Sequence, residues 1–193
     1  MWKELNPGLR MMVVMTVLTG VIYPVVVTGI AQVAFRDRAN GSLIELNGQI
    51  VGSRLIGQNF SRPEYFHPRP SAAGDKGYDP MATGGSNFGP TSGKLIDRVK
   101  ASVEQYRKEN LDYGGPIPAD AVTASASGLD PDISPRNAEI QTARVAKARG
   151  VPAAQIQEAI ARHTRPRGLG FLGEPAVNVL ELNLDLDGRL ARK

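Results

Sequence analysis

The sequence predicts a single membrane-spanning helix followed by one α+β domain. Residues 11–35 carry no charged side chain, and no later segment resembles this run. The rest of the chain mixes apolar patterns of helical period with one stretch of strict alternation. About 155 residues follow the run, which is enough for one domain with a core of its own.

The uncharged run is long enough to cross a bilayer. As a helix it would span about 37 Å, compared with a hydrocarbon core of about 30 Å. A cleaved signal peptide is the alternative, because Gly29-Ile30-Ala31 has a small-x-small pattern. Since the run exceeds the usual apolar region of about 7–15 residues, we expect a retained anchor. The flanking charges leave its orientation open; they are Lys3, Glu4 and Arg10 before it, and Arg36, Asp37 and Arg38 after it.

Small or polar side chains recur every fourth residue within the run. The positions are Thr16, Gly20, Pro24, Thr28 and Gln32. Small residues at this spacing let a second helix approach closely, so we interpret them as a membrane packing face. Pro24 also removes one backbone hydrogen bond, which predicts a mild kink. Chance is the alternative, because Gly and Pro are common in membrane helices.

The early part of the α+β domain contains a hairpin and a long loop. Asn47-Gly48 lies between two apolar stretches, which predicts a two-residue hairpin turn. Residues 57–93 are dense in Gly, Pro, Ser and Asn, and their apolar side chains are mainly aromatic. We expect this segment to be a packed, ordered loop, because loops of this length are usually functional or disordered and the aromatic residues favour packing.

Three helices and a final strand are predicted after the loop. The first covers residues 94–109, with its apolar residues on one face. The second begins at Pro135 with Ser134 as its N-cap and stops at Gly150, and the third runs from Pro152 to about residue 164. Residues 180–187 alternate leucine with polar residues, which predicts a half-buried C-terminal strand.

The composition argues against several kinds of site. The chain contains no cysteine and two histidines, His67 and His163, and neither has a second ligand at metal-binding spacing. Ser125 and Ser127 lie outside any G-x-S-x-G pattern, so a turn with side-chain-to-backbone hydrogen bonds is favoured over a nucleophile. The net charge of +4 is spread along the chain, which gives no nucleic-acid footprint. We expect no catalytic centre and no metal site.

These segments together resemble the KdpC family, the small subunit of the bacterial Kdp potassium-transporting P-type ATPase. The resemblance covers nearly the whole chain, and each motif gains its specificity from its order after a single span. The motifs are Leu9-Arg10 and Tyr23-Pro24 in the span, Asn47-Gly48, Gly57-Gln-Asn-Phe60, Phe66-His-Pro-Arg-Pro-Ser71, Tyr78-Asp-Pro80, Gly84-Gly-Ser-Asn87, Val122-Thr-Ala-Ser-Ala-Ser-Gly-Leu-Asp-Pro-Asp-Ile-Ser134, Ala138-Glu-Ile-Gln141, Ala143-Arg-Val-Ala146 and Val177-Asn-Val179.

The resemblance implies a non-catalytic subunit that supports complex assembly and K⁺ affinity. It implies three partners besides the lipid bilayer: a channel-like K⁺-conducting subunit, a P-type ATP-hydrolysing subunit and a very small membrane subunit. It also implies a location in the bacterial inner membrane, with residues 1–10 cytoplasmic, residues 11–35 spanning, and residues 36–193 forming an extracytoplasmic, periplasmic domain. No tightly bound cofactor is implied. A nucleotide role, with ATP as the ligand, would fall on Ser125, Ser127, Gly128, Asp130 and Gln141.

Two other classes of function remain open at this point. One is a free-standing, membrane-anchored extracytoplasmic binding module. The other is an anchored hydrolase that uses the serine-rich loop. Migration of the protein in a large complex on a native gel would separate a pump subunit from both.

Overall fold

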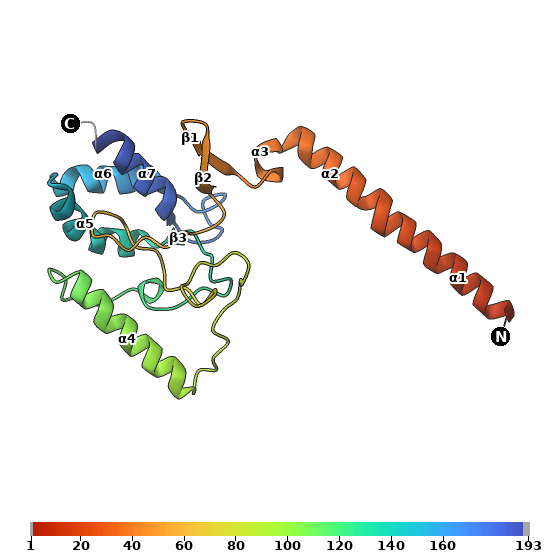
Figure 1. The fold of residues 1–193 in the computed structure, drawn as a ribbon, viewed down its shortest axis with the longest axis horizontal. Coiled ribbons are helices and arrows are strands. Elements are labelled where there is room, and N and C mark those ends of the chain that lie inside the picture. The colour runs from red at the N-terminus through yellow and green to blue at the C-terminus, as the bar shows by residue number, and fades with distance from the viewer. Residues whose placement is uncertain (1, 191–193) are drawn as a thin grey trace. The chain divides into compact units, whose positions relative to one another are not determined.

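The computed structural model describes residues 2–190 and divides the chain into two compact units. The first unit covers residues 1–51 and the second covers residues 52–193. Figure 1 shows the order of the elements along the chain.

The first unit consists mainly of one long helix in three parts. The parts are α1 (Trp2–Val17), the π-helical η1 (Leu18–Ile22) and α2 (Tyr23–Ala34). The stretch Lys3–Ala34 contains an 18-residue window with a mean hydropathy of 2.1. Of the described residues, it is the one helix long and apolar enough to cross a membrane by length and composition. A single candidate span is therefore present where the anchor is predicted, and the short α3 (Arg36–Ala39) follows it.

A π-helical turn lies just before Pro24, the residue at which a mild kink is predicted. In this turn the Tyr23 amide donates to the Leu18 carbonyl, five residues back. Four residues of α-helix turn about 400°, so a line of every fourth residue winds by about 160° over four steps. A π-turn absorbs one extra residue, or about 100° of rotation, which reduces this winding to roughly 60°. The π-turn therefore keeps the line from Thr16 to Gln32 close to one side of the helix.

The predicted hairpin is confirmed. Strands β1 (Leu43–Leu46) and β2 (Gln49–Ser53) form a two-stranded sheet. Both turn residues have left-handed backbone angles, with φ of 52° at Asn47 and 77° at Gly48. This is the conformation that a two-residue hairpin turn requires.

All three predicted helices of the α+β domain are confirmed. They are α4 (Gly93–Glu109), α5 (Pro135–Arg149) and α6 (Ala153–His163), and the 3₁₀ turn η2 (Ala119–Ala121) lies between the first two. The Ser134 side chain accepts a hydrogen bond from the Asn137 amide at the start of α5, and Gly150 ends the helix with φ of 66°. The local capping signals therefore placed both ends of α5 correctly.

The predicted C-terminal strand is wrong, because the segment forms the helix α7 (Val179–Leu190). Val179, Leu182, Asn183 and Leu186 are all buried, which is a helical spacing. The alternation of leucine with polar residues predicted a strand because it assigned Asn183 to the exposed face. In the structure Asn183 is only 1 % exposed. A polar residue inside the core concealed the helical period.

Three short strands missing from the sequence prediction form the sheet of the second unit. Their order is β3 (Asp132–Ile133), β5 (Ala176–Asn178) and β4 (Thr164–Arg165), and both pairings are antiparallel. Strands of two or three residues are too short to produce a periodic pattern.

The second unit contains two hydrophobic clusters. The larger is built from α5, α6, α7 and β5 around Phe66. The smaller joins Tyr106 of α4 to Ile140 of α5, together with Ala121 and Val122. The segment between β2 and α4 forms no helix or named strand, and Phe66 at its centre is fully buried. This agrees with the predicted packed loop.

Candidate functional site

The backbone of the long loop is held by two buried side-chain amides. Asn183 accepts from the Phe66 amide at 2.8 Å and donates to the Phe66 carbonyl at 3.0 Å. Gln141 does the same at His67, with distances of 2.8 and 3.1 Å. Each amide thus replaces the pair of hydrogen bonds that a neighbouring strand would supply. We call Asn183 and Gln141 the amide clamp.

Two arginines of α5 also donate hydrogen bonds to the backbone of the loop. Arg144 donates from Nη1 to the carbonyls of Pro63 at 2.7 Å and Tyr65 at 2.9 Å. Its Nη2 donates to Gln141 at 2.6 Å, and burial lowers the pKa of its guanidinium. Arg149 donates to the Glu64 carbonyl at 2.7 Å. Three polar side chains of α5, Gln141, Arg144 and Arg149, are therefore bonded to the backbone of the loop.

The two histidines each contact a carboxylate. His67 Nδ1 lies 3.0 Å from Glu109 Oε2, and its Nε2 lies 3.1 Å from the Arg62 carbonyl. His163, the last residue of α6, lies 3.1 Å from Asp185. Among the described residues, no group of three or more His, Cys, Asp or Glu side chains is arranged to hold a metal ion.

The hydrogen bond with His67 makes Glu109 a source of acid sensitivity. This bond holds the pKa of Glu109 below its ordinary value of 4.5, and burial opposes it. Because the folded pKa is the lower one, the stabilisation is complete above about pH 4.5 and is lost as pH falls through the folded pKa. We expect Glu109→Gln to lessen the fall in unfolding midpoint of the full chain between pH 5 and pH 3, measured with urea.

Glu104→Gln serves as the control for this prediction. Glu104 lies on the same helix and its side chain is exposed. The control should follow the pH dependence of the wild type. Identical pH profiles for the two variants would remove the proposed role of the Glu109–His67 pair.

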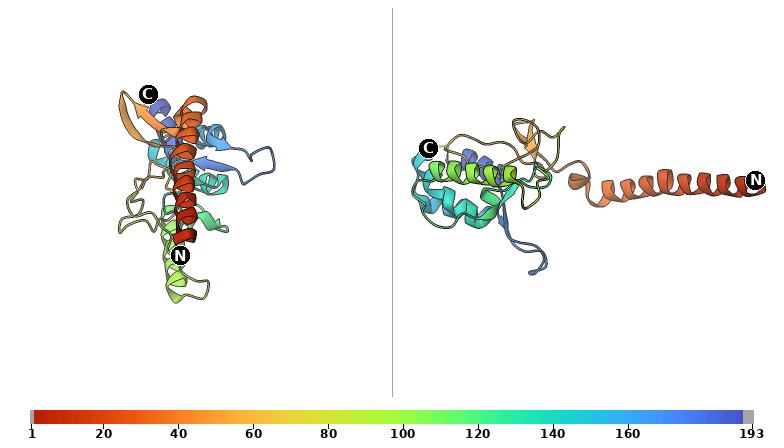
Figure 2. Two further views of the ribbon diagram at one scale, coloured as in Figure 1. Left: turned by 90° about the vertical axis from the view of Figure 1, so that its right-hand side faces the viewer. Right: turned by 90° about the horizontal axis from the view of Figure 1, so that it is seen from below.

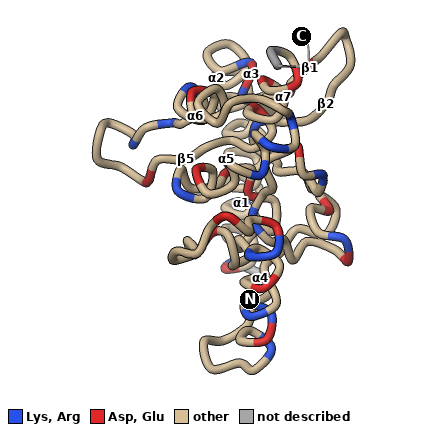
Figure 3. Tube along the Cα trace, turned by 90° about the vertical axis from the view of Figure 1, so that its left-hand side faces the viewer, with Lys and Arg blue, Asp and Glu red and all other residues tan. Residues whose placement is uncertain are grey.

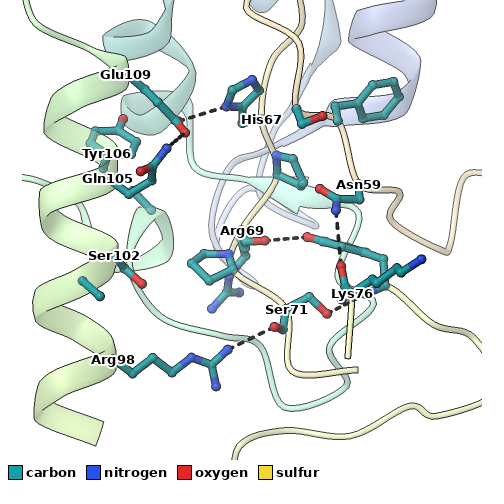
Figure 4. A pocket seen from close by; sticks show the side chains of 18 of the residues that line it. Asn59, His67, Arg69, Ser71, Lys76, Arg98, Ser102, Gln105, Tyr106 and Glu109 are labelled. Carbon is teal, nitrogen blue, oxygen red and sulfur yellow. Dashed lines mark hydrogen bonds and ion pairs between the residues drawn. The ribbon is translucent and has the colours of Figure 1, made fainter. Parts of the chain in front are cut away.

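A polar groove lies between α4 and the long loop. Its volume is about 570 Å³, and it is lined by side chains of α4, among them Arg98, Ser102 and Gln105, and of the loop, among them Asn59 and Lys76. Figure 4 shows Arg98 reaching from α4 toward Ser71 of the loop, with Asn59 and Lys76 on the opposite wall.

Hydrogen bonds within the protein occupy the most reactive groups of this groove. Ser71 donates to the Gly128 carbonyl at 2.7 Å and accepts from the Tyr78 amide at 2.8 Å. The Tyr78 hydroxyl donates to the Arg69 carbonyl at 2.8 Å, and burial raises the pKa of this phenol. The hydroxyl groups of Ser71 and Tyr78 are therefore bonded to the backbone, and within the described part of the chain neither is hydrogen-bonded to a basic side chain.

The serine-rich loop forms the turn that its composition favoured. Ser125 Oγ accepts from the Gly128 amide at 2.9 Å, and Ser127 Oγ accepts from the Leu129 amide at 3.1 Å. Asp130 is paired with Arg69 at 2.6 Å. Both serines and Asp130 line a shallow depression of about 630 Å³.

The nucleotide residues implied by the resemblance are divided between two places. Ser125, Ser127 and Asp130 line the depression, whereas Gln141 lines the groove beside α4. Gly128 is enclosed by backbone, with its φ at 70°. Arg69 lines both hollows, and it is not among the residues predicted to form a site. Nucleotide binding remains a prediction.

Fold and site together define a class of protein: one candidate membrane helix joined to an α+β domain whose buried polar groups hold its own loops. The family model KdpC, described as "K+-transporting ATPase, c chain", matches residues 5–188. The chain belongs to the KdpC family.

Relatives of similar length support this assignment. The chain is 57 % identical over 188 residues to the potassium-transporting ATPase KdpC subunit of Koribacter versatilis, covering 97 % of this chain and 96 % of that protein. It is 55 % identical to the KdpC subunit of Mycobacterium tuberculosis, covering 97 % and 99 %. The KdpC subunit of Gemmatimonas aurantiaca is 57 % identical over 189 residues, covering 97 % and 94 %.

Proposed function

We propose that this chain is an accessory subunit of a Kdp-type potassium uptake complex, where it supports assembly and K⁺ affinity without catalysing ATP hydrolysis itself. The observation that carries the proposal is the family match over residues 5–188, which includes the candidate span and the domain together. Its partners are a channel-like K⁺-conducting subunit, a P-type ATP-hydrolysing subunit and a very small membrane subunit. The free-standing binding module is the alternative.

The proposed location is the bacterial cytoplasmic membrane, with the N-terminus inside and the α+β domain outside. The single candidate span Lys3–Ala34 supports an anchor. The proposed orientation rests on the family resemblance, because the charges that flank the span do not decide it.

The packing face of the span is the proposed membrane contact. Its five positions, Thr16 to Gln32, lie close to one side of the helix because of the π-turn. The side chain of Thr19 donates to the Met15 carbonyl at 2.7 Å, which satisfies that polar group inside the helix. Gly20 itself has no side chain, so a second helix can approach the backbone closely there.

Gly20→Leu is expected to lower recovery of the complex. A Cβ at Gly20 would meet only the Thr16 methyl group at 3.9 Å, so the substitution fits the isolated helix and obstructs only a neighbour. We expect several-fold less partner subunit to co-purify with the tagged chain, and a matching loss of K⁺-stimulated ATPase activity.

Gly29→Leu provides the matched control, because Gly29 lies off the packing line and a Cβ there meets nothing within 4 Å. This variant should assemble normally, and a preparation without the chain sets the lower limit. Equal recovery of Gly20→Leu and Gly29→Leu would rule out the packing face. Failure of the wild-type chain to co-purify with the pump subunits would rule out the proposed function and favour the binding module.

A further inference from the structure

The hairpin between β4 and β5 ends in an exposed apolar tip. Leu169, Phe171 and Leu172 are 84 %, 69 % and 54 % exposed. In the described part of the second unit, no other four consecutive residues expose three large apolar side chains. Figure 2 shows this hairpin extending away from the body of the unit. We call residues 168–172 the apolar tip.

The backbone of the apolar tip is fixed by its own hydrogen bonds. Gly168 and Leu172 exchange two amide-to-carbonyl bonds of 2.8 Å, and the Phe171 amide donates to the Gly168 carbonyl at 3.2 Å. The tip is therefore a preformed structure, and binding would not require it to order first.

Leu169 holds a backbone conformation that its side chain disfavours. Its φ is 51°, in the left-handed region, where a residue with a Cβ costs about 1–2 kcal/mol. Glycine would adopt the same angle without this cost. Because this leucine is exposed, it contributes little to the packing of the domain itself. Its strained conformation is therefore better explained by a contact with another molecule.

The charges beside the tip argue for a protein as its partner. Arg165 is paired with Asp132, and Arg167 is paired with Glu174 at 2.6 Å. Figure 3 shows the uncharged tip between these flanking charges. Each arginine beside the tip has one acidic partner, so the rim carries charges of both signs in equal number and no excess of cations that would favour anionic lipid headgroups. A rigid apolar projection with a charged rim instead matches the anatomy of a protein interface.

We propose that the apolar tip inserts into an apolar pocket on another subunit of the pump. This inference rests on the proposed function, which supplies the partner. Leu169 and Phe171 are the anchors, since large apolar side chains seated in a pocket contribute most of the affinity at such contacts. The bilayer surface is the competing occupant, and the test distinguishes the two.

The test compares two sets of exposed substitutions in the full complex. The triple variant Leu169→Ser, Phe171→Ser and Leu172→Ser alters the tip. The matched control carries Met81→Ser and Leu111→Ser, whose side chains are 92 % and 83 % exposed elsewhere on the same unit. Loss of one or two anchor contacts corresponds to at least about tenfold weaker association.

We expect at least tenfold less of the tip variant than of the control to remain with the partner subunits after washing. Near-ultraviolet circular dichroism of each purified chain should match the wild type, which separates a lost contact from a lost fold. Equal retention of tip variant and control, with the wild-type chain assembling normally, would overturn the inference and leave the proposed function intact. Absence of wild-type assembly would instead count against the proposed function.

A probe at the tip decides between protein and lipid. The chain contains no cysteine, so Leu172→Cys gives a single attachment site for a bimane fluorophore before reconstitution with the partner subunits in nanodiscs. Insertion into a protein pocket predicts a blue-shifted emission that brominated lipids leave unquenched. Strong quenching by brominated lipids would place the tip in the bilayer and overturn the inference.

Discussion

Replacing Asn183 with leucine is expected to lower the unfolding free energy by about 3–5 kcal/mol. The substitution leaves two buried backbone groups without hydrogen-bond partners, at a cost of about 1–3 kcal/mol each. The Asn183 side chain is the partner of both the amide and the carbonyl of Phe66, and Phe66 is fully buried. Leucine has nearly the same size, so the loss comes from hydrogen bonding and not from a cavity. The expected change is a large part of the roughly 5–15 kcal/mol typical of a domain.

Urea unfolding of the full chain in detergent, followed by near-ultraviolet circular dichroism, measures this effect. Asn59→Leu is the matched control, since Asn59 is exposed and makes one backbone hydrogen bond of 3.3 Å. Its effect should stay within about 0.5 kcal/mol. Similar midpoints for the two variants would mean that water, or a shift of the loop, replaces the amide clamp at Phe66.

The second large effect is expected at Gly128, where alanine should cost roughly 3–5 kcal/mol from backbone strain and steric overlap together. Its φ is 70°, and a Cβ there would lie 2.8 Å from the Gly84 carbonyl oxygen and 2.9 Å from the Ala73 nitrogen. Because these neighbours are backbone atoms, they cannot move aside as a flexible side chain would.

Gly150→Ala separates the two contributions. Gly150 has a similar φ of 66°, but a Cβ there meets nothing within 4 Å. That variant should therefore report the cost of the backbone conformation alone, about 1 kcal/mol. The difference between the two variants in the same urea experiment measures the overlap at Gly128. A difference near zero would contradict the close approach of the loop segments that contain Gly128, Gly84 and Ala73.

The parts of the fold that the sequence predicted well are those with local signals. Ser134 and Gly150 mark the ends of α5, and Asn47-Gly48 marks the hairpin, because capping and turn preferences depend on a few adjacent residues. The candidate span was predictable for the same reason, from one uninterrupted apolar run.

The parts that failed depend on partners far away in the chain. Asn183 looked like a surface residue because nothing near it in sequence reveals that its partner is Phe66. The nucleotide role that the resemblance implies for Gln141 stays a prediction, but the sequence could not show that its amide bonds the backbone of His67, 74 residues away. The three short strands and the groove beside α4 likewise arise only from tertiary packing.

The amide clamp at Phe66 can form only late in the synthesis of the chain. Phe66 and Asn183 are 117 residues apart, so at roughly 5–20 residues per second the loop is synthesised about 6–23 seconds before its partner exists. During that interval an aromatic side chain destined for the core stays uncovered, and contacts of such long range are slow to form once both ends are present. The nascent chain is thus most exposed to aggregation just before its last helix is complete, and removal of α7 would prolong that state indefinitely.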